Sequence, residues 1–235
     1  MTTRKRIFVI AVLTALASGV LAPASEAAAS RYITVSAQGT VKVVPDAVRI
    51  IATATTVAAS NKEALAITAK TAAAVRAALK SAKVDSKDIA TQSVSVYPEY
   101  KYNTDGTSTL VGYRASQAFT ITVRAADTAG SIVDSLIATG GDNLQINGAT
   151  PFILDSTKSL EAARTAAVKS AKAKATSYAK LLGVKLGKVN YLVENSAPTN
   201  YTPVMAVAKA ESDATVIDLG QQDVTISVTV QWSLL

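Results

Sequence analysis

The chain has no cysteine and no histidine among its 235 residues. Without cysteine it can form no disulfide, so its stability must come from a packed core. The same absences exclude zinc sites built on these two residues, and they remove the base of Ser-His-Asp and Cys-His nucleophile systems. Much ordinary hydrolase chemistry is therefore excluded, although the chain is long enough for one core or for two joined lobes.

Motifs for other chemistry are also scarce. No two carboxylates are placed by local spacing as an acid/base pair, and no D-x-D-x-D-G loop offers oxygen ligands to a cation. Ser177 and Lys180 have S-x-x-K spacing, but the accompanying S-D-N and K-T-G motifs are missing. We therefore expect a protein that is not an enzyme and has no cofactor or metal. The alternative is an enzyme whose carboxylate or lysine chemistry is assembled by the tertiary fold.

Residues 1–29 read as a secretory signal. Arg4, Lys5 and Arg6 precede an apolar run over residues 7–22, and small residues then offer competing A-x-A cleavage sites. The run is shorter than the ~20 residues of a spanning helix, so an uncleaved anchor is the alternative. Cleavage would lower the net charge from +7 to +5. We expect an exported envelope protein with no membrane span after cleavage, and export argues against nucleic acid as a partner.

The first part of the mature chain combines two strand patterns with a helix. Residues 33–38 and 48–54 alternate between apolar and polar side chains, which predicts two antiparallel strands. Gly39 indicates a bulge or a close backbone approach. Ser60 and Glu63 form a capping box, and an amphipathic helix is expected over residues 61–82.

A tyrosine-rich hairpin is predicted next. Residues 89–103 and 108–125 are its strands, and Asp105-Gly106 is typical of a two-residue type I′ turn. With the turn centred there, Tyr102 would face Thr109 and Tyr100 would face Val111. The candidate interface residues gathered on this hairpin are Tyr97, Tyr100, Tyr102, Tyr113 and Arg114.

A long helix is expected from residue 155 or 156 to 182, after a short helix and a further strand. One face carries alanines at positions 163, 167, 171, 175 and 179, with Leu160, Tyr178 and Leu182 expected beside them. The opposite side carries Lys158, Lys169, Lys172 and Lys180. This lysine face is either solvated or in contact with an anionic envelope surface.

The C-terminal part is expected to hold a strand over 186–195, a long surface loop over 195–222 and a strongly alternating last strand. The element order is then ββαββαβαββ. Paired strands with interspersed helices indicate an α+β fold with antiparallel sheets and packed helices.

This arrangement resembles the SIMPL-domain family of exported bacterial proteins over residues 30–235. The residues that carry the resemblance are, in chain order, Val35 and Gly39, Pro45-Asp46-Ala47, the helix capped by Ser60, Thr91, Tyr97-Pro98 with Tyr100 and Tyr102, Gly112-Tyr113-Arg114-Ala115, "FTITV", Gly140-Gly141-Asp142-Asn143, Asn147-Gly148, "FILD", the alanine-spaced helix and the last strand. The resemblance implies a periplasmic or outer-envelope location, large homo-oligomers in some members and an indirect link to oxidative-stress tolerance. It supplies no catalytic residues.

The tyrosine hairpin admits three interpretations. Its aromatic pairs can stabilise the sheet itself, its exposed side can contact another copy or a partner, or its tyrosines with Lys101 and Arg114 can stack on a ligand. We expect a self-assembling or binding protein, with an envelope polymer, lipid or protein as further partner classes. A monomeric envelope ligand-binding module is the alternative to self-assembly.

Overall fold

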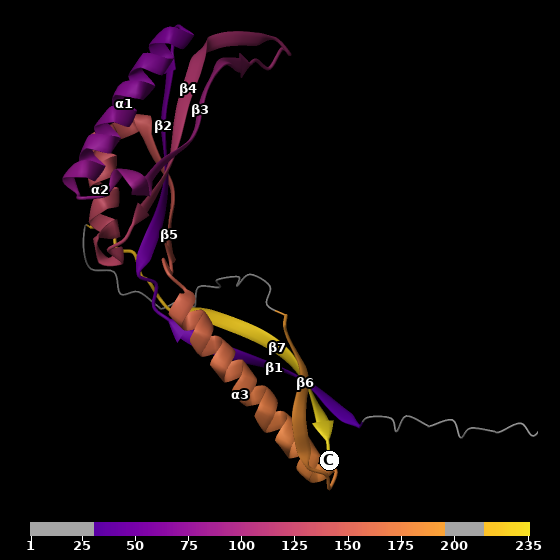
Figure 1. The fold of residues 1–235 in the computed structure, drawn as a ribbon. Coiled ribbons are helices and arrows are strands. Elements are labelled where there is room, and N and C mark those ends of the chain that lie inside the picture. Colours follow the sequence, from indigo (N-terminus) through magenta and orange to yellow (C-terminus); the bar gives the residue numbers. More distant parts are fainter. Residues whose placement is uncertain (1–30, 196–213) are drawn as a thin grey trace, which may run out of the picture.

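The computed structural model describes residues 31–195 and 214–235, which form two lobes joined end to end (Figure 1). The signal predicted over residues 1–29 and most of the loop predicted over 195–222 lie outside the described residues. Every strand pairing in the described residues is antiparallel, and the order of helices and strands is ββαββαβαββ. The predicted α+β fold is confirmed.

The larger lobe is a four-stranded sheet covered on one face by two helices (Figure 1). Its strands, in the spatial order β3-β4-β2-β5, are β3 (Ile89–Tyr102), β4 (Ser108–Val123), β2 (Ala47–Ala58) and β5 (Leu144–Phe152). Its helices are α1 (Asn61–Ser81) and α2 (Ala129–Gly140). The predicted cap is present, since the Ser60 side chain accepts a hydrogen bond from the Glu63 amide at 3.2 Å.

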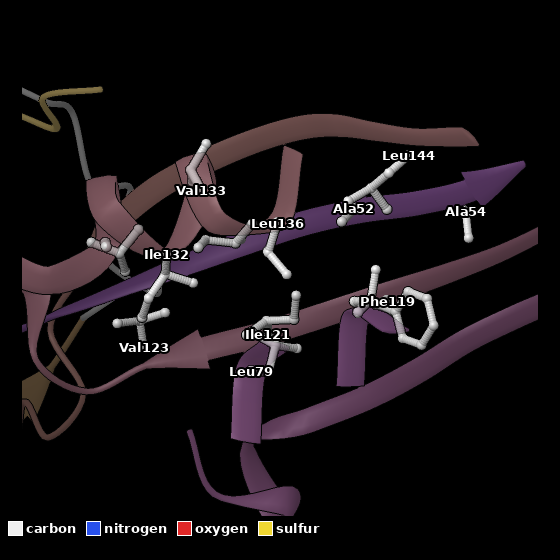
Figure 2. Close-up of a cluster of buried hydrophobic side chains, with 14 of the residues drawn as sticks. Ala52, Ala54, Leu79, Phe119, Ile121, Val123, Ile132, Val133, Leu136 and Leu144 are labelled. Atoms are coloured by element: carbon white, nitrogen blue, oxygen red, sulfur yellow. The ribbon is translucent and has the colours of Figure 1, made fainter. Parts of the chain in front are cut away.

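The core of this lobe lies between the sheet and the helices. Alternation along β2 and β4 directs one set of apolar side chains to the helices, and Ile50 and Phe119 are fully buried there. Figure 2 shows Ile132 and Leu136 of α2 lying toward Ile121 of β4. The other face of the sheet carries paired polar side chains such as Thr55 and Ser116, whose hydroxyl oxygens are 3.0 Å apart.

The smaller lobe is a three-stranded sheet with one long helix. Its strands, in the spatial order β1-β7-β6, are β1 (Tyr32–Val43), β7 (Gln222–Leu234) and β6 (Leu186–Glu194). Helix α3 (Thr157–Leu181) lies along β1 and β7 (Figure 1). The face of the sheet away from α3 is polar, with hydroxyl ladders such as Ser36 to Thr229 at 2.9 Å.

Small residues bring α3 close to its sheet. The buried residues of α3 are Ala163, Ala167, Ala171, Ala175 and Ala179. A Cβ atom at Gly39 of β1 would lie only 2.2 Å from the backbone nitrogen of Ala167. The predicted close approach at Gly39 is therefore confirmed. Tyr178 and Leu182 were expected on this face but are 53% and 65% exposed, because the contact follows the four-residue alanine ridge.

The pairing expected between the first two strands is wrong. β1 pairs with β7 along its whole length, whereas β2 pairs with β4 and β5 in the other lobe. Pro45, which cannot donate a backbone hydrogen bond, separates the two strands, and the chain crosses between the lobes there instead of turning back. Alternation alone reports that a strand has one buried face and does not identify its partner.

Within residues 31–195 and 214–235, the chain crosses between the lobes three times, and hydrogen bonds tie these crossings together. Asp46, after β1, accepts a bond at 2.8 Å from the amide of Leu154, which follows β5. The side-chain amide of Gln222, at the start of β7, donates to the Pro151 carbonyl at 2.8 Å. Residues 214–221, part of the predicted surface loop, also pack inward, since Ile217 and Leu219 contact the core of the larger lobe.

Candidate functional site

The β3–β4 hairpin extends past the rest of its sheet as an arm, which we define as residues 99–112 (Figure 1). The last pairing of β2 with β4 joins Ala58 to Tyr113, so the arm has only its own two strands beyond that point. A register shift at Glu99/Tyr100, where Val111 is the extra residue on β4, marks its base. A two-stranded ribbon of this kind has two exposed faces and is marginally stable alone.

The turn at the tip differs from the predicted type I′ form. The Gly106 amide donates to the Asn103 carbonyl and the Asn103 amide donates to Thr107, which closes a three-residue loop. Gly106, at φ +84°, has the positive φ, whereas type I′ would also require one at Asp105. The register is accordingly shifted by one residue, and Tyr100 lies opposite Leu110 and Tyr102 opposite Ser108.

The hairpin tyrosines are exposed to different extents. Tyr102 is 82% exposed near the tip, while Tyr97 and Tyr100 are each 48% exposed. Tyr113 and Arg114 are half-buried and lie opposite Pro98 and Tyr97 at the base of the arm. The structure thus separates the predicted set into a base cluster of Tyr97, Tyr113 and Arg114 and a tip pair of Tyr100 and Tyr102.

An ion pair holds the base of the arm. The Arg114 guanidinium donates two hydrogen bonds to the Glu99 carboxylate, and both side chains are about one-third exposed. These bonds lower the pKa of Glu99 and raise the pKa of Arg114, with burial opposing both shifts. Arg114 therefore has a partner within its own hairpin, which is consistent with a structural role for this residue.

Exposed apolar side chains are spread over the β3–β4 hairpin, and most of them are on β3. Large apolar side chains exposed on the hairpin are Val94, Val96, Tyr97, Tyr100, Tyr102, Leu110 and Val111. Within the part of the chain that the structure describes, β3 pairs with β4 alone, so its outer backbone groups have no strand partner.

A second apolar edge was missed from the sequence. β6 lies at the edge of the smaller sheet, and Val189, Tyr191, Leu192 and Val193 are each 42–55% exposed. Register shifts with β7 at Val189 and Tyr191 let apolar side chains appear on both faces of β6. The run of apolar residues around Tyr191 was a signal for this edge, but it reads equally well as a buried strand.

The predicted lysine face is present on the solvent side of α3. Lys158, Lys169, Lys172 and Lys180 are all exposed, away from the alanine ridge. They occupy a separate lobe from the tyrosine hairpin, so the two candidate sites are not brought together (Figure 1). Nothing in the structure assigns a ligand to this face.

Two further kinds of feature are absent from the described residues. Among them, no group of three or more carboxylate side chains is placed to hold a metal ion. None of the helices in these same ranges combines the length and the apolar character needed to cross a membrane.

Comparison with known proteins identifies the family. The SIMPL family, described as "Protein of unknown function (DUF541)", matches residues 33–232. The chain is 26% identical over 215 residues to the 26 kDa periplasmic immunogenic protein of Brucella melitensis biotype 1, covering 86% of this chain and 84% of that protein. It is 31% identical over 203 residues to the protein YggE of Escherichia coli (strain K12), covering 83% of this chain and 78% of the relative. It is also similar to YggE of Edwardsiella ictaluri, at 29% identity over 150 residues and 61% of each chain. With the family match spanning nearly all of the described fold, this chain belongs to the SIMPL family.

Proposed function

We propose that this SIMPL protein is exported to the cell envelope and acts there without catalysis, by assembling with further copies of itself. The location is supported by the predicted signal over residues 1–29 and by the Brucella relative, whose name places it in the periplasm. The absence of histidine and cysteine supports a non-catalytic function. Any link to stress tolerance is then indirect, because there is no thiol to oxidise.

The observation that carries the proposal is the pair of open edges, which are the outer edges of β3 and β6. An edge strand presents unpaired backbone donors and acceptors to which another strand can add. Monomeric proteins protect such edges with charges, proline, short strands or a covering element. Along β3, Pro98, Glu99, Lys101 and two register shifts offer some protection. Five large apolar side chains nevertheless remain exposed on it, namely Val94, Val96, Tyr97, Tyr100 and Tyr102.

The other two sheet edges of the same molecule are protected. Helix α3 packs along β1, and Lys174 donates a hydrogen bond to the Ser36 carbonyl of that strand at 3.3 Å. β5 carries Pro151 and a register shift beside Gly148. Register shifts also occur along β3 and β6, so what distinguishes the edges is their exposed apolar surface. Five large apolar side chains are exposed on β3 and four on β6, against Tyr32 alone on β1 and β5 together, and this contrast favours a partner at β3 and β6.

The arm supplies the side chains that such a contact needs. Tyrosine is enriched at protein interfaces because it buries a large rigid ring while its hydroxyl keeps a hydrogen-bond partner. Tyr100 and Tyr102, two residues apart on β3, lie on the same side of the strand. A second copy docked there would cover both rings, and they would carry a large share of the association energy.

The test is the solution mass of the mature protein, measured by light scattering over a concentration series. We expect a discrete assembly, and we expect Tyr100→Ser with Tyr102→Ser to give a folded but smaller species. The matched control is Tyr178→Ser with Leu181→Ser, which removes two exposed apolar side chains from α3 and should leave the mass unchanged.

Three results would count against the proposal. They are a monomer at all concentrations, an unchanged mass in the hairpin variant, and an equal loss in the control variant. A monomer would favour the ligand-binding alternative, for which the lysine face of α3 offers a surface for anionic envelope polymers or lipids.

A further inference from the structure

An open pocket of about 660 Å³ lies where α1 ends and β3 begins. Its lining residues are Arg76, Lys80, Lys83, Val84, Asp85, Ser86 and Ile89. The pocket is at the end of β3 opposite the tip of the arm, because Ile89 begins that strand and Tyr102 ends it. Its volume is in the range of small-molecule sites in proteins.

The pocket has an excess of positive charge. Three of its lining side chains are cations, and the one carboxylate, Asp85, is 3.0 Å from the ammonium group of Lys87. Among the described residues, neither Lys80 nor Lys83 forms an ion pair, and the nearby carboxylate of Asp88 binds Arg124. An anion could therefore bind here without displacing an internal partner of either lysine.

Arg76 is held in place at the wall of the pocket. Its guanidinium donates a hydrogen bond to the Thr91 hydroxyl at 3.4 Å and lies 5.1 Å from the centre of the Phe119 ring. A cation positioned in advance loses less conformational entropy when an anion binds than a freely rotating one does.

Lys83 adopts an unusual backbone conformation for its residue type. It is the one non-glycine residue with positive φ, at +62°, in the part of the chain that the structure covers. Its amide donates to the Lys80 carbonyl and the Val84 amide donates to the Leu79 carbonyl, so α1 ends in a Schellman motif. The carbonyls of Leu79 and Lys80 are thereby satisfied, which reduces their repulsion of an anion.

Helix α3 ends in the same motif but uses glycine. The Gly183 amide donates to Lys180 and the Val184 amide to Ala179, with Gly183 at φ +68°. Glycine makes this turn without steric cost, whereas any other residue is strained there. The presence of lysine instead of glycine at the equivalent position of α1 points to a use for its side chain in the pocket.

We propose that this pocket binds a phosphate monoester that carries an apolar group. A phosphate monoester is close to a dianion at neutral pH, and its three terminal oxygens can accept bonds from Arg76, Lys80 and Lys83. The half-buried side chains of Val84 and Ile89 provide an apolar wall for the attached group. The hydroxyl of Ser86 is a further donor at the rim.

Titration calorimetry of the mature protein with phenyl phosphate tests the proposal. We expect saturable binding that weakens as salt is added, because exposed ion pairs are screened. Inorganic phosphate should bind about tenfold more weakly, since it lacks the apolar group. Benzyl alcohol, which lacks the charge, should show no binding. Equal affinity for both phosphates, or no saturable binding of phenyl phosphate, would overturn the proposal.

Lys83→Gly is the informative variant, because glycine keeps the turn and removes the cation. We expect phenyl phosphate to bind about fivefold more weakly, while the melting temperature rises as the backbone strain is relieved. Lys172→Gln, which removes an exposed lysine from the other lobe, is the matched control and should bind as the parent protein does. Unchanged affinity in Lys83→Gly, or an equal loss in Lys172→Gln, would refute the assignment.

Discussion

At the scale of single residues, the ion pair between Asp88 and Arg124 joins the start of β3 to the end of β4. The Asp88 side chain is 8% exposed and accepts two hydrogen bonds from Arg124, at 2.7 and 2.8 Å. The bonds from Arg124 outweigh burial and lower the pKa of Asp88 below its ordinary 3.8. The pair therefore stabilises the fold only while Asp88 is ionised.

We predict that Asp88→Asn lowers the free energy of unfolding by about 1–2 kcal/mol at neutral pH, because one charged partner of a strong bond is lost. A depressed folded pKa contributes stability above the unfolded value of 3.8, and this contribution disappears as the pH falls through the folded pKa. The deficit of the variant should therefore shrink toward about pH 2. Urea unfolding at the two pH values measures it.

The control for this prediction is Asp85→Asn. Asp85 is 64% exposed and pairs with Lys87, which is 67% exposed, so its loss should cost less than about 1 kcal/mol. A deficit in Asp88→Asn that is the same at both pH values would show that the side-chain shape, and not the charge, is responsible.

At the scale of elements, the alanine ridge of α3 sets the distance between helix and sheet. Ala171 is fully buried in the middle of that ridge. We predict that Ala171→Leu destabilises the protein by about 1–3 kcal/mol, because the larger side chain must push the helix from β1 and β7. Thermal or urea unfolding followed by circular dichroism measures the effect.

Ala173→Leu is the matched control on the same helix. Ala173 is exposed, and leucine is nearly as good a helix former as alanine, so the change should stay within about 0.5 kcal/mol. Equal destabilisation by the two substitutions would contradict the close packing of α3 on its sheet.

For helix α3, the sequence pattern predicted part of the buried face correctly and part of it wrongly. The four-residue spacing of alanine predicted which residues face the sheet, and Gly39 predicted a close approach. A helical wheel also placed Tyr178 and Leu182 on that face, but the buried contact follows the narrow alanine ridge, where Ala179 is still buried, and leaves these two side chains exposed. The extent of a buried face depends on the partner element, whose position is a tertiary property.

At the scale of the whole molecule, the larger lobe is one continuous stretch, residues 47–152, inserted between the parts of the smaller lobe. Its core receives Ile217 and Leu219 from outside that stretch. We predict that a fragment of residues 47–152 folds cooperatively by itself, because it holds its own sheet, helices and core. It should be less stable than the same lobe in the full chain by about 1–3 kcal/mol, since two apolar contacts are missing.

Urea unfolding followed by helical circular dichroism tests this prediction. In the full chain, Ile217→Asn with Leu219→Asn should lower the stability of the larger lobe toward that of the fragment. Trp232, the single tryptophan, lies in the smaller lobe and reports that lobe separately by fluorescence. An unfolded fragment, or one as stable as the lobe in the full chain, would contradict the insertion of an autonomous lobe.

Local patterns in this sequence determined which segments became helices and strands, and in which order, and they predicted the buried residues of β7 and the alanine ridge of α3. Alternation in β7, the capping box before α1 and the alanine spacing of α3 are readable because each depends on neighbours close in the chain. The absence of cysteine and histidine likewise excluded disulfides and catalytic or metal sites built on these residues, from the sequence alone.

Tertiary structure alone decided how those segments were combined. It paired β1 with β7 from the other end of the chain, left β3 and β6 as open edges, and gathered Arg76, Lys80 and Lys83 around one pocket. The hairpin register also depended on a single positive φ at Gly106, which the Asp-Gly pair did not specify. Strand pairing and surface clusters bring together residues that are far apart in the sequence. Local periodicity does not indicate which of these distant residues meet.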